Sequence, residues 1–306
     1  MAELIVHVGC PKCGSTMLQR YVFPELDGVR YIDFRGESEI YQALALRAFP
    51  DGESARNDVL ARFAEAVTAA DRPTLISAEH FVMPAAAFRG LPGRPLRLLD
   101  GADILDRLAR LPVSIRVVTL LRRQDQWLRS WHQERVKRYE TRGFAAFAAA
   151  PDNAHLLDVL AYDRMLSALE GRFGTDAIVA LPFELLTHDP ASFWDRLRAV
   201  LPMLPDDIDP PRVRTSMRDE TVVLRRLGNR ARRGLAALTG GETAFDRLIF
   251  RGLKSAYAMD SMFDRVMPRR PADATLPPDV LERFRPDNRA LADRLSSDLA
   301  ALGYPC

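Results

Sequence analysis

LIVHVGCPKCGST, residues 4–16, joins an aliphatic run to a glycine-containing loop and then to a helical pattern. The run from Leu4 to Val8 predicts a buried β-strand, and the apolar spacing within residues 17–22 predicts a helix that Pro24 ends. At such a junction the unpaired N–H groups of the helix and its dipole favour an anion. The stretch therefore predicts a strand–loop–helix unit with a phosphate-binding loop.

The residue types within this loop suit a phosphate. Gly14 allows close approach of the backbone, Ser15 and Thr16 add hydroxyl donors, and Lys12 adds a mobile positive charge. A Walker loop would need lysine directly after the second glycine, where this chain has Ser15. A cysteine-phosphatase loop would need an arginine six residues after its cysteine, and neither Cys10 nor Cys13 has one.

Two other interpretations of the same loop stay open. Cys10 and Cys13 form a C-x-x-C at a helix start, which is typical of thioredoxin-like redox sites. The Gly-Ser-Thr turn could also do no more than cap the helix. The loop alone does not decide between a phosphate site, a redox site and a cap.

A second motif favours the phosphate site. The run from Ile115 to Leu121 predicts another buried strand, which leads into Arg122 and a helix over residues 124–137 that carries Ser130. Arginine at a strand end and serine about a turn and a half into the next helix can converge on one phosphate. Since parallel sheets bind ligands at the carboxyl ends of their strands, two such motifs suit a nucleotide with two separated phosphates.

The rest of the chain predicts the fold class. Further strands are expected over Thr74–Ala78 and Ala177–Leu181, with helices between them and a helix stop at Phe173-Gly174. This alternation predicts an α/β, P-loop-like, three-layer fold with a central parallel sheet flanked by helices. We expect a single domain over residues 1–306, in which residues from about 205 onward form a helical extension.

Composition limits the partners. Of the 306 residues, 43 are Lys or Arg and 41 are Asp or Glu, and the net charge of +2 does not favour nucleic acid. No run approaches the roughly 20 apolar residues of a membrane span, and the first residues lack a signal-peptide pattern. Three cysteines do not make a disulfide framework, so a cytoplasmic location is expected. No metal-type spacing is present, and nothing indicates an oligomeric state.

Taken together, the two motifs resemble those of sulfotransferases that use PAPS (3′-phosphoadenosine 5′-phosphosulfate), most closely the bacterial branch. Residues 7–16 resemble that family's 5′-phosphosulfate loop, typically Pro-Lys-(Ser/Thr)-Gly-(Thr/Ser)-Thr, and residues 121–130 are similar to its 3′-phosphate motif. Cys13 stands where the family usually has serine or threonine. Weaker similarities, to the middle of the family's sequence and to its C-terminal helix, lie at Tyr162-Asp163, Phe173-Gly174, Phe183-Glu184 and residues 287–292.

The resemblance implies roles for particular residues. Lys12 would stabilise charge on the oxygen between sulfur and phosphorus, and the backbone of Cys13–Met17, with the hydroxyls of Ser15 and Thr16, would hold the 5′-phosphate. Arg122 and Ser130 would hold the 3′-phosphate. PAPS would be the donor and PAP (adenosine 3′,5′-bisphosphate) the product, with no metal, and the acceptor would be a small molecule, carbohydrate or lipid.

The general base is expected after the strand over residues 74–78. Glu79 is favoured because bacterial members often have Ser-Ser-Glu here, and His80 is second. The plainer interpretation is that Glu79 forms a salt bridge and that His80 caps or packs. A kinase-like phosphotransferase and a nucleotide-binding protein without catalysis also remain open.

Overall fold

The computed structural model describes residues 3–33, 39–82, 101–206, 208, 216–239, 260–261, 263–265 and 276–306, without the side chains of His80 and His155. It divides into two compact units. The first comprises residues 1–124, 155–213 and 283–306, and the second comprises residues 125–154 and 214–282. The expected C-terminal extension is thus shared between the units, and the single-domain assignment stays a prediction.

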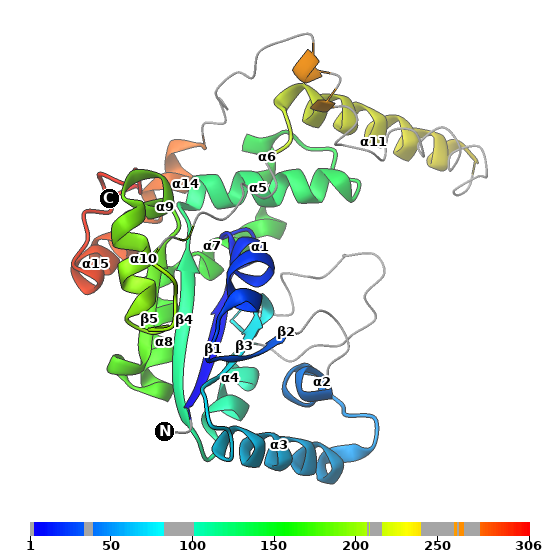
Figure 1. Ribbon diagram of the computed structural model, residues 1–306. Coiled ribbons are helices and arrows are strands. Elements are labelled where there is room, and N and C mark those ends of the chain that lie inside the picture. Colours follow the sequence, from blue (N-terminus) through cyan, green and yellow to red (C-terminus); the bar gives the residue numbers. More distant parts are fainter. Residues whose placement is uncertain are drawn as a thin grey trace. The chain divides into compact units, whose positions relative to one another are not determined.

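A parallel sheet forms the centre of the first unit (Figure 1). Its order is β2-β3-β1-β4-β5, with β1 Glu3–Gly9, β2 Arg30–Asp33, β3 Thr74–Ala78, β4 Ser114–Leu121 and β5 Ile178–Pro182. All pairings are parallel, and Val8 of β1 lies opposite Ala78 of β3 and Thr119 of β4. The segments after β1, β3 and β4 therefore leave the sheet at one edge. The predicted α/β class and its parallel sheet are confirmed.

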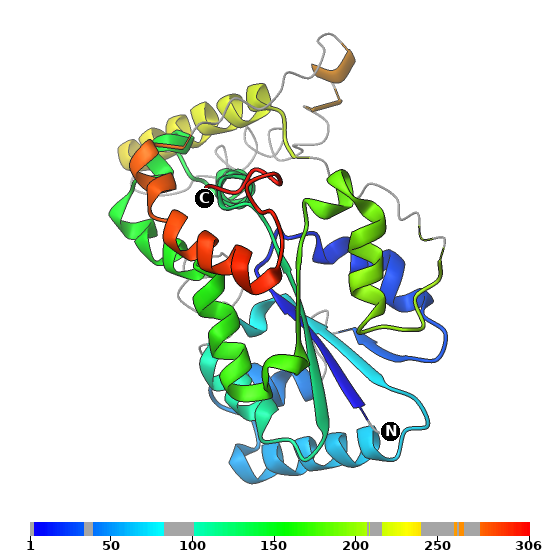
Figure 2. The ribbon, with the colours of Figure 1, turned by 90° about the vertical axis from the view of Figure 1, so that its left-hand side faces the viewer.

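Helices cover both faces of this sheet (Figure 2). Helices α4, α8 and α15 lie on one side, and α1 and α10 lie on the other. The bounds in this unit are α1 Ser15–Met17, α2 Glu39–Ala45, α3 Gly52–Thr68, α4 Gly101–Ala109, α8 Tyr162–Phe173, α9 Leu185–His188, α10 Pro190–Arg198 and α15 Arg285–Leu295. Helix α7 Ala154–Val159 belongs to the first unit except for its first residue. Gly174, with φ 87°, ends α8 as predicted.

The helix after the first loop differs from the predicted one. Only residues 15–17 are α-helical, followed by a π-helical turn over Leu18–Val22 and a 3₁₀ turn over Phe23–Glu25. Pro24 lies inside that 3₁₀ turn and does not end the helix at its own position. The wider π turn leaves Tyr21 42% exposed, whereas Leu18 and Val22 are buried. Apolar spacing predicted the helical run but not its change of pitch.

The second unit is built on α5 Gln124–Lys137 and α11 Asp219–Thr239, with the shorter α6 Phe144–Ala148 and α14 Pro278–Glu282. The Gln133 side chain joins α5 to the segment just before α11: it donates to the Met217 carbonyl and accepts from the Met217 N–H, both at 3.0 Å. Trp127 and Trp131 stack with ring centroids 5.4 Å apart. The helix expected over residues 124–137 is confirmed.

Candidate active site

The loop after β1 is compact and turns its cysteines inward. The side chains of Cys10 and Cys13 are buried, whereas Lys12 and Gly14 are partly exposed. Lys12 has φ 74° and Gly14 has φ 95°, so the chain twice adopts the left-handed conformation. The Met17 N–H then donates to the Gly14 carbonyl at 2.9 Å, which closes the first helical turn. Anchored by its cysteines, the loop presents its backbone at the carboxyl edge of the sheet.

Gly14 is required here by packing as well as by its φ angle. A Cβ at this position would overlap the ring of Phe183, the residue after β5. The close approach lets the ring of Phe183 support the loop from the side. The sequence analysis did not predict this contact, because Phe183 entered it only through a weak similarity. The signal that could have indicated it is the position of Phe183 directly after a predicted strand.

The start of α1 carries donors that suit an anion. The Ser15 hydroxyl is buried and has no hydrogen-bond partner among the described residues. The first N–H groups of a helical run also lack intrahelical acceptors. An orphaned hydroxyl beside such N–H groups is the donor set that a phosphate would satisfy.

Arg122 follows β4 and contacts the loop directly. Its Nη1 donates to the Lys12 carbonyl at 2.7 Å, and its guanidinium lies over the Phe183 ring, 5.6 Å from the centroid. Arginine has five N–H donors, so this bond leaves others for a ligand. The structure thus places Arg122, from the second motif, in direct contact with the phosphate loop of the first motif.

A hydrogen-bond network holds the backbone around Arg122. The Tyr162 hydroxyl donates to the Arg122 carbonyl at 2.7 Å. Glu184 accepts from the Arg123 N–H at 2.9 Å through Oε1 and from the Tyr304 hydroxyl at 2.8 Å through Oε2. Burial raises the pKa of Glu184, and these donors act against that rise. The C-terminal segment therefore braces the strand ends, a role for Tyr304 that the sequence did not indicate.

Glu79 lies at the same edge, at the first position after β3. Burial raises the pKa of Cys10, and the charge of Glu79 raises it further, so the Glu79 carboxylate lies near the loop. The Glu79 side chain is partly exposed. The side chain of His80 lies outside the described part of the chain, so the structure does not compare the two candidate bases.

The two loop cysteines do not have the properties of a redox pair. Both are free thiols. Burial raises the pKa of Cys10 to about 12 and that of Cys13 well above its ordinary value. Reactive C-x-x-C sites depend on a lowered thiol pKa. The environment therefore disfavours the redox interpretation, while inhibition through a Cys10–Cys13 disulfide stays a prediction.

Ser130 lies on α5, in the second unit, and is partly exposed. Its convergence with Arg122 on one phosphate stays a prediction. Within the described ranges, no cluster of three or more His, Cys, Asp or Glu residues could hold a metal ion. Nor does any helix described combine the length and apolarity needed to cross a membrane.

Comparison with solved structures identifies the architecture. A sulfotransferase from Alicyclobacillus acidocaldarius matches over 98% of this chain and 98% of its own, with a TM-score of 0.51 and 15% sequence identity. This chain has a sulfotransferase fold. The sulfotransferase domain from the curacin biosynthetic pathway matches more weakly, over 97% and 99% of the two chains, at a TM-score of 0.44 and 12% identity. No family model and no curated protein matches the sequence. The structural similarity confirms the resemblance to sulfotransferases that the two sequence motifs indicated.

Proposed function

We propose that this chain transfers a sulfuryl group from PAPS to a hydroxyl or amine of an acceptor by in-line displacement. The main support is the bond between the two motifs: Arg122, after β4, donates to the carbonyl of Lys12, in the loop after β1. A donor with a 5′-phosphosulfate and a 3′-phosphate needs two anion sites a short distance apart. The sulfotransferase fold supports the same proposal.

The proposed donor roles are those that the resemblance to sulfotransferases implies, and the chemistry of the residues is compatible with them. The N–H groups of residues 13–17 and the hydroxyls of Ser15 and Thr16 would hold the 5′-phosphate. Arg122 would hold the 3′-phosphate, together with Ser130. Lys12 would approach the oxygen between sulfur and phosphorus, where negative charge grows as PAP leaves, because a charge placed there favours the transition state over the ground state.

The acceptor would be activated by a general base at the end of β3. We propose Glu79, with His80 as the alternative. The base would remove the acceptor proton as the oxygen or nitrogen attacks sulfur, the S–O bond to PAP breaks, and the sulfuryl group passes to the acceptor. A small molecule, a carbohydrate or a lipid remains the proposed acceptor class, and a screen with labelled PAPS would identify it.

Calorimetric titration of PAP without metal tests the donor site. The wild type should bind PAP at micromolar concentrations and 5′-AMP at least tenfold more weakly. Arg122→Ala should lose about ten- to a hundredfold in PAP affinity, because a hydrogen bond to a charged group contributes about 1.5–3 kcal/mol. Arg20→Ala, exposed on the turn after the loop, is the matched control and should bind normally.

Two results would overturn the proposal. One is the absence of PAP binding by folded, reduced protein. The other is binding of ATP with magnesium that tolerates Arg122→Ala, which would favour the kinase-like alternative.

Lys12→Ala and Glu79→Gln separate binding from chemistry: once an acceptor is known, both should lower kcat far more than they weaken PAP binding. A protein that only binds the nucleotide would show no transfer to any acceptor.

A further inference from the structure

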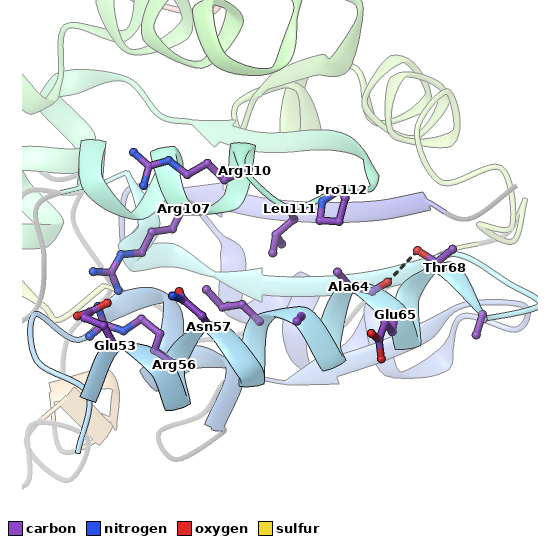
Figure 3. Close-up of a pocket in the computed structure, with 13 residues that line it drawn as sticks. Glu53, Arg56, Asn57, Ala64, Glu65, Thr68, Arg107, Arg110, Leu111 and Pro112 are labelled. Carbon is purple, nitrogen blue, oxygen red and sulfur yellow. Dashed lines mark hydrogen bonds and ion pairs between the residues drawn. The ribbon is translucent and has the colours of Figure 1, made fainter. Parts of the chain in front are cut away.

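A groove of about 640 Å³ lies between α3 and α4 of the first unit (Figure 3). One end reaches Leu111 and Pro112, just before the start of β4 at Ser114. Arg122 of the candidate active site follows the opposite end of the same strand. The groove is therefore separate from the phosphate loop, and the proposed reaction does not use it.

The walls of the groove are mainly apolar. Leu60 and Ala64 of α3 and Leu111 after α4 line its length, with Ala61, Ala69 and Pro112 beside them. Ala64 and Leu111 are buried, and Ala61 lies at the open side. Small-molecule sites commonly have volumes of about 300–1,000 Å³, apolar walls and a few polar groups that fix the ligand's orientation. The dimensions of the groove fall within that class.

The other end of the groove has more positive than negative charge. The Arg56 side chain is 1% exposed and is held by Glu53 through Nη1 (2.6 Å) and by the Leu46 carbonyl through Nη2 (3.0 Å). Arg107 enters the same end (Figure 3) and donates to the Ala43 carbonyl at 3.0 Å. Among the described residues, no carboxylate forms an ion pair with Arg107. Glu53, itself largely exposed, is the carboxylate that pairs with Arg56.

The proximity of the two guanidinium groups has an electrostatic cost. Burial and then the positive charge of Arg56 lower the pKa of Arg107, and the carboxylates of Glu53 and Asp103 offset part of that effect. The Nε of Arg56 is buried and has no partner in the described structure. An anion at this end would relieve the repulsion and accept from the remaining N–H groups of Arg107.

We propose that this groove binds a small amphiphilic anion, with its acidic group at Arg107 and its apolar body along Leu60, Ala64 and Leu111. The recognised chemistry is a single carboxylate or sulfate carried on an alkyl or aryl body. A neutral molecule of the same shape would gain the apolar contacts but not the charged hydrogen bonds. This inference does not depend on the donor or the reaction proposed above.

Titration with decanoate below its micellar range tests the proposal, with binding followed by calorimetry and by amide NMR shifts in α3 and α4. Decanol is the neutral probe and should bind at least tenfold more weakly than decanoate. Arg107→Met should reduce decanoate affinity at least tenfold and leave decanol affinity unchanged, and Arg107→Lys should restore part of the loss. Arg62→Met removes a 63% exposed arginine of α3 that does not line the groove, and it should bind as the wild type does.

Ala61→Trp adds a second test that spares the buried core. Its indole would fill the groove from the open side, so binding of both probes should fall while PAP binding is unchanged. Equal binding of decanoate and decanol, undiminished decanoate binding by Arg107→Met or Ala61→Trp, or no binding by the folded wild type at millimolar concentrations would overturn the proposal. PAP binding is measured on the same samples. A failure of the groove proposal can therefore be distinguished from a failure of the proposed donor site.

Discussion

At the scale of single residues, the candidate site depends on side chains that are closely packed and buried. The loop glycine contacts an aromatic ring from another strand end, the loop cysteines are buried, and His7 of β1 is fully buried. The Nδ1 of His7 lies 2.7 Å from the Ser77 hydroxyl of β3. Each of these contacts has a measurable consequence.

Gly14→Ala should damage both stability and donor binding. The new Cβ would overlap Phe183 at a positive φ, and overpacking costs about 1–3 kcal/mol. Chemical denaturation and PAP titration measure the two effects. Gly171→Ala is the matched control: Gly171 lies in α8, where a Cβ would meet no atom within 4 Å, so stability should not fall. Normal PAP binding by Gly14→Ala would contradict the proposed role of the loop.

Thiol reactivity should follow burial. With the pKa of Cys10 raised to about 12, about one thiol in ten thousand is ionised at pH 8. An aromatic disulfide reagent should therefore modify the partly exposed Cys306 first in the native protein, and all three thiols after unfolding. Cys306→Ser should show no fast reaction. Fast modification of Cys10 or Cys13 in the native state would restore the redox interpretation.

His7 should make the protein acid-sensitive. Burial lowers its pKa from 6.5 to about 3, so the unfolded chain binds a proton that the folded chain does not. Its contribution to stability is complete above pH 6.5 and is lost as the pH falls from 6.5 towards 3, by about 1.4 kcal/mol per pH unit. Urea unfolding at pH 7, 6 and 5 should give a flatter pH slope for His7→Gln. His188→Gln, exposed at the end of α9, should keep the wild-type slope.

At the scale of elements, the sequence predicted the buried strands well. The runs assigned to β1, β3, β4 and β5 match within a residue or two, because strands covered on both faces are continuously apolar. The sequence missed β2, an edge strand of four residues that is exposed at both ends and partly buried between them. A segment this short, with two apolar residues, gives no periodic signal.

Tyr304→Phe should weaken the hydrogen-bond network at the ends of β4 and β5. The change removes the donor to Glu184 Oε2 and leaves a carboxylate in a mostly buried position with one partner fewer. We expect about 1–3 kcal/mol lower stability, and weaker PAP binding because the backbone beside Arg122 is less firmly held. Tyr21→Phe is the control, since Tyr21 is 42% exposed. Unchanged stability of Tyr304→Phe would show that the network does not brace the site.

At the scale of the whole molecule, the phosphate loop with Arg122 and the α3–α4 groove are proposed ligand sites on different elements of the first unit. Amide hydrogen exchange, measured with each ligand in turn, should distinguish the two sites. PAP should slow amide exchange in residues 9–17 and 121–124, and decanoate should slow it in α3 and in residues 107–112. PAP at a hundred times its Kd should add about 2.7 kcal/mol of stability. Protection of α3 and α4 by PAP, or of the loop by decanoate, would show that the two sites are not distinct.

The sequence by itself determined the strand–loop–helix unit at Gly14, the parallel α/β class and the position of Arg122 at a strand end. These features depend on neighbouring residues: a short apolar run, a glycine and a helix start lie within a few positions of one another. The tertiary structure alone decided which side chains meet. Arg122 bonds to Lys12 across 110 positions, and Tyr304 bonds to Glu184 across 120. Such contacts leave no local pattern, because they arise only when packing of the sheet brings distant strand ends together, and the α3–α4 groove arises in the same way.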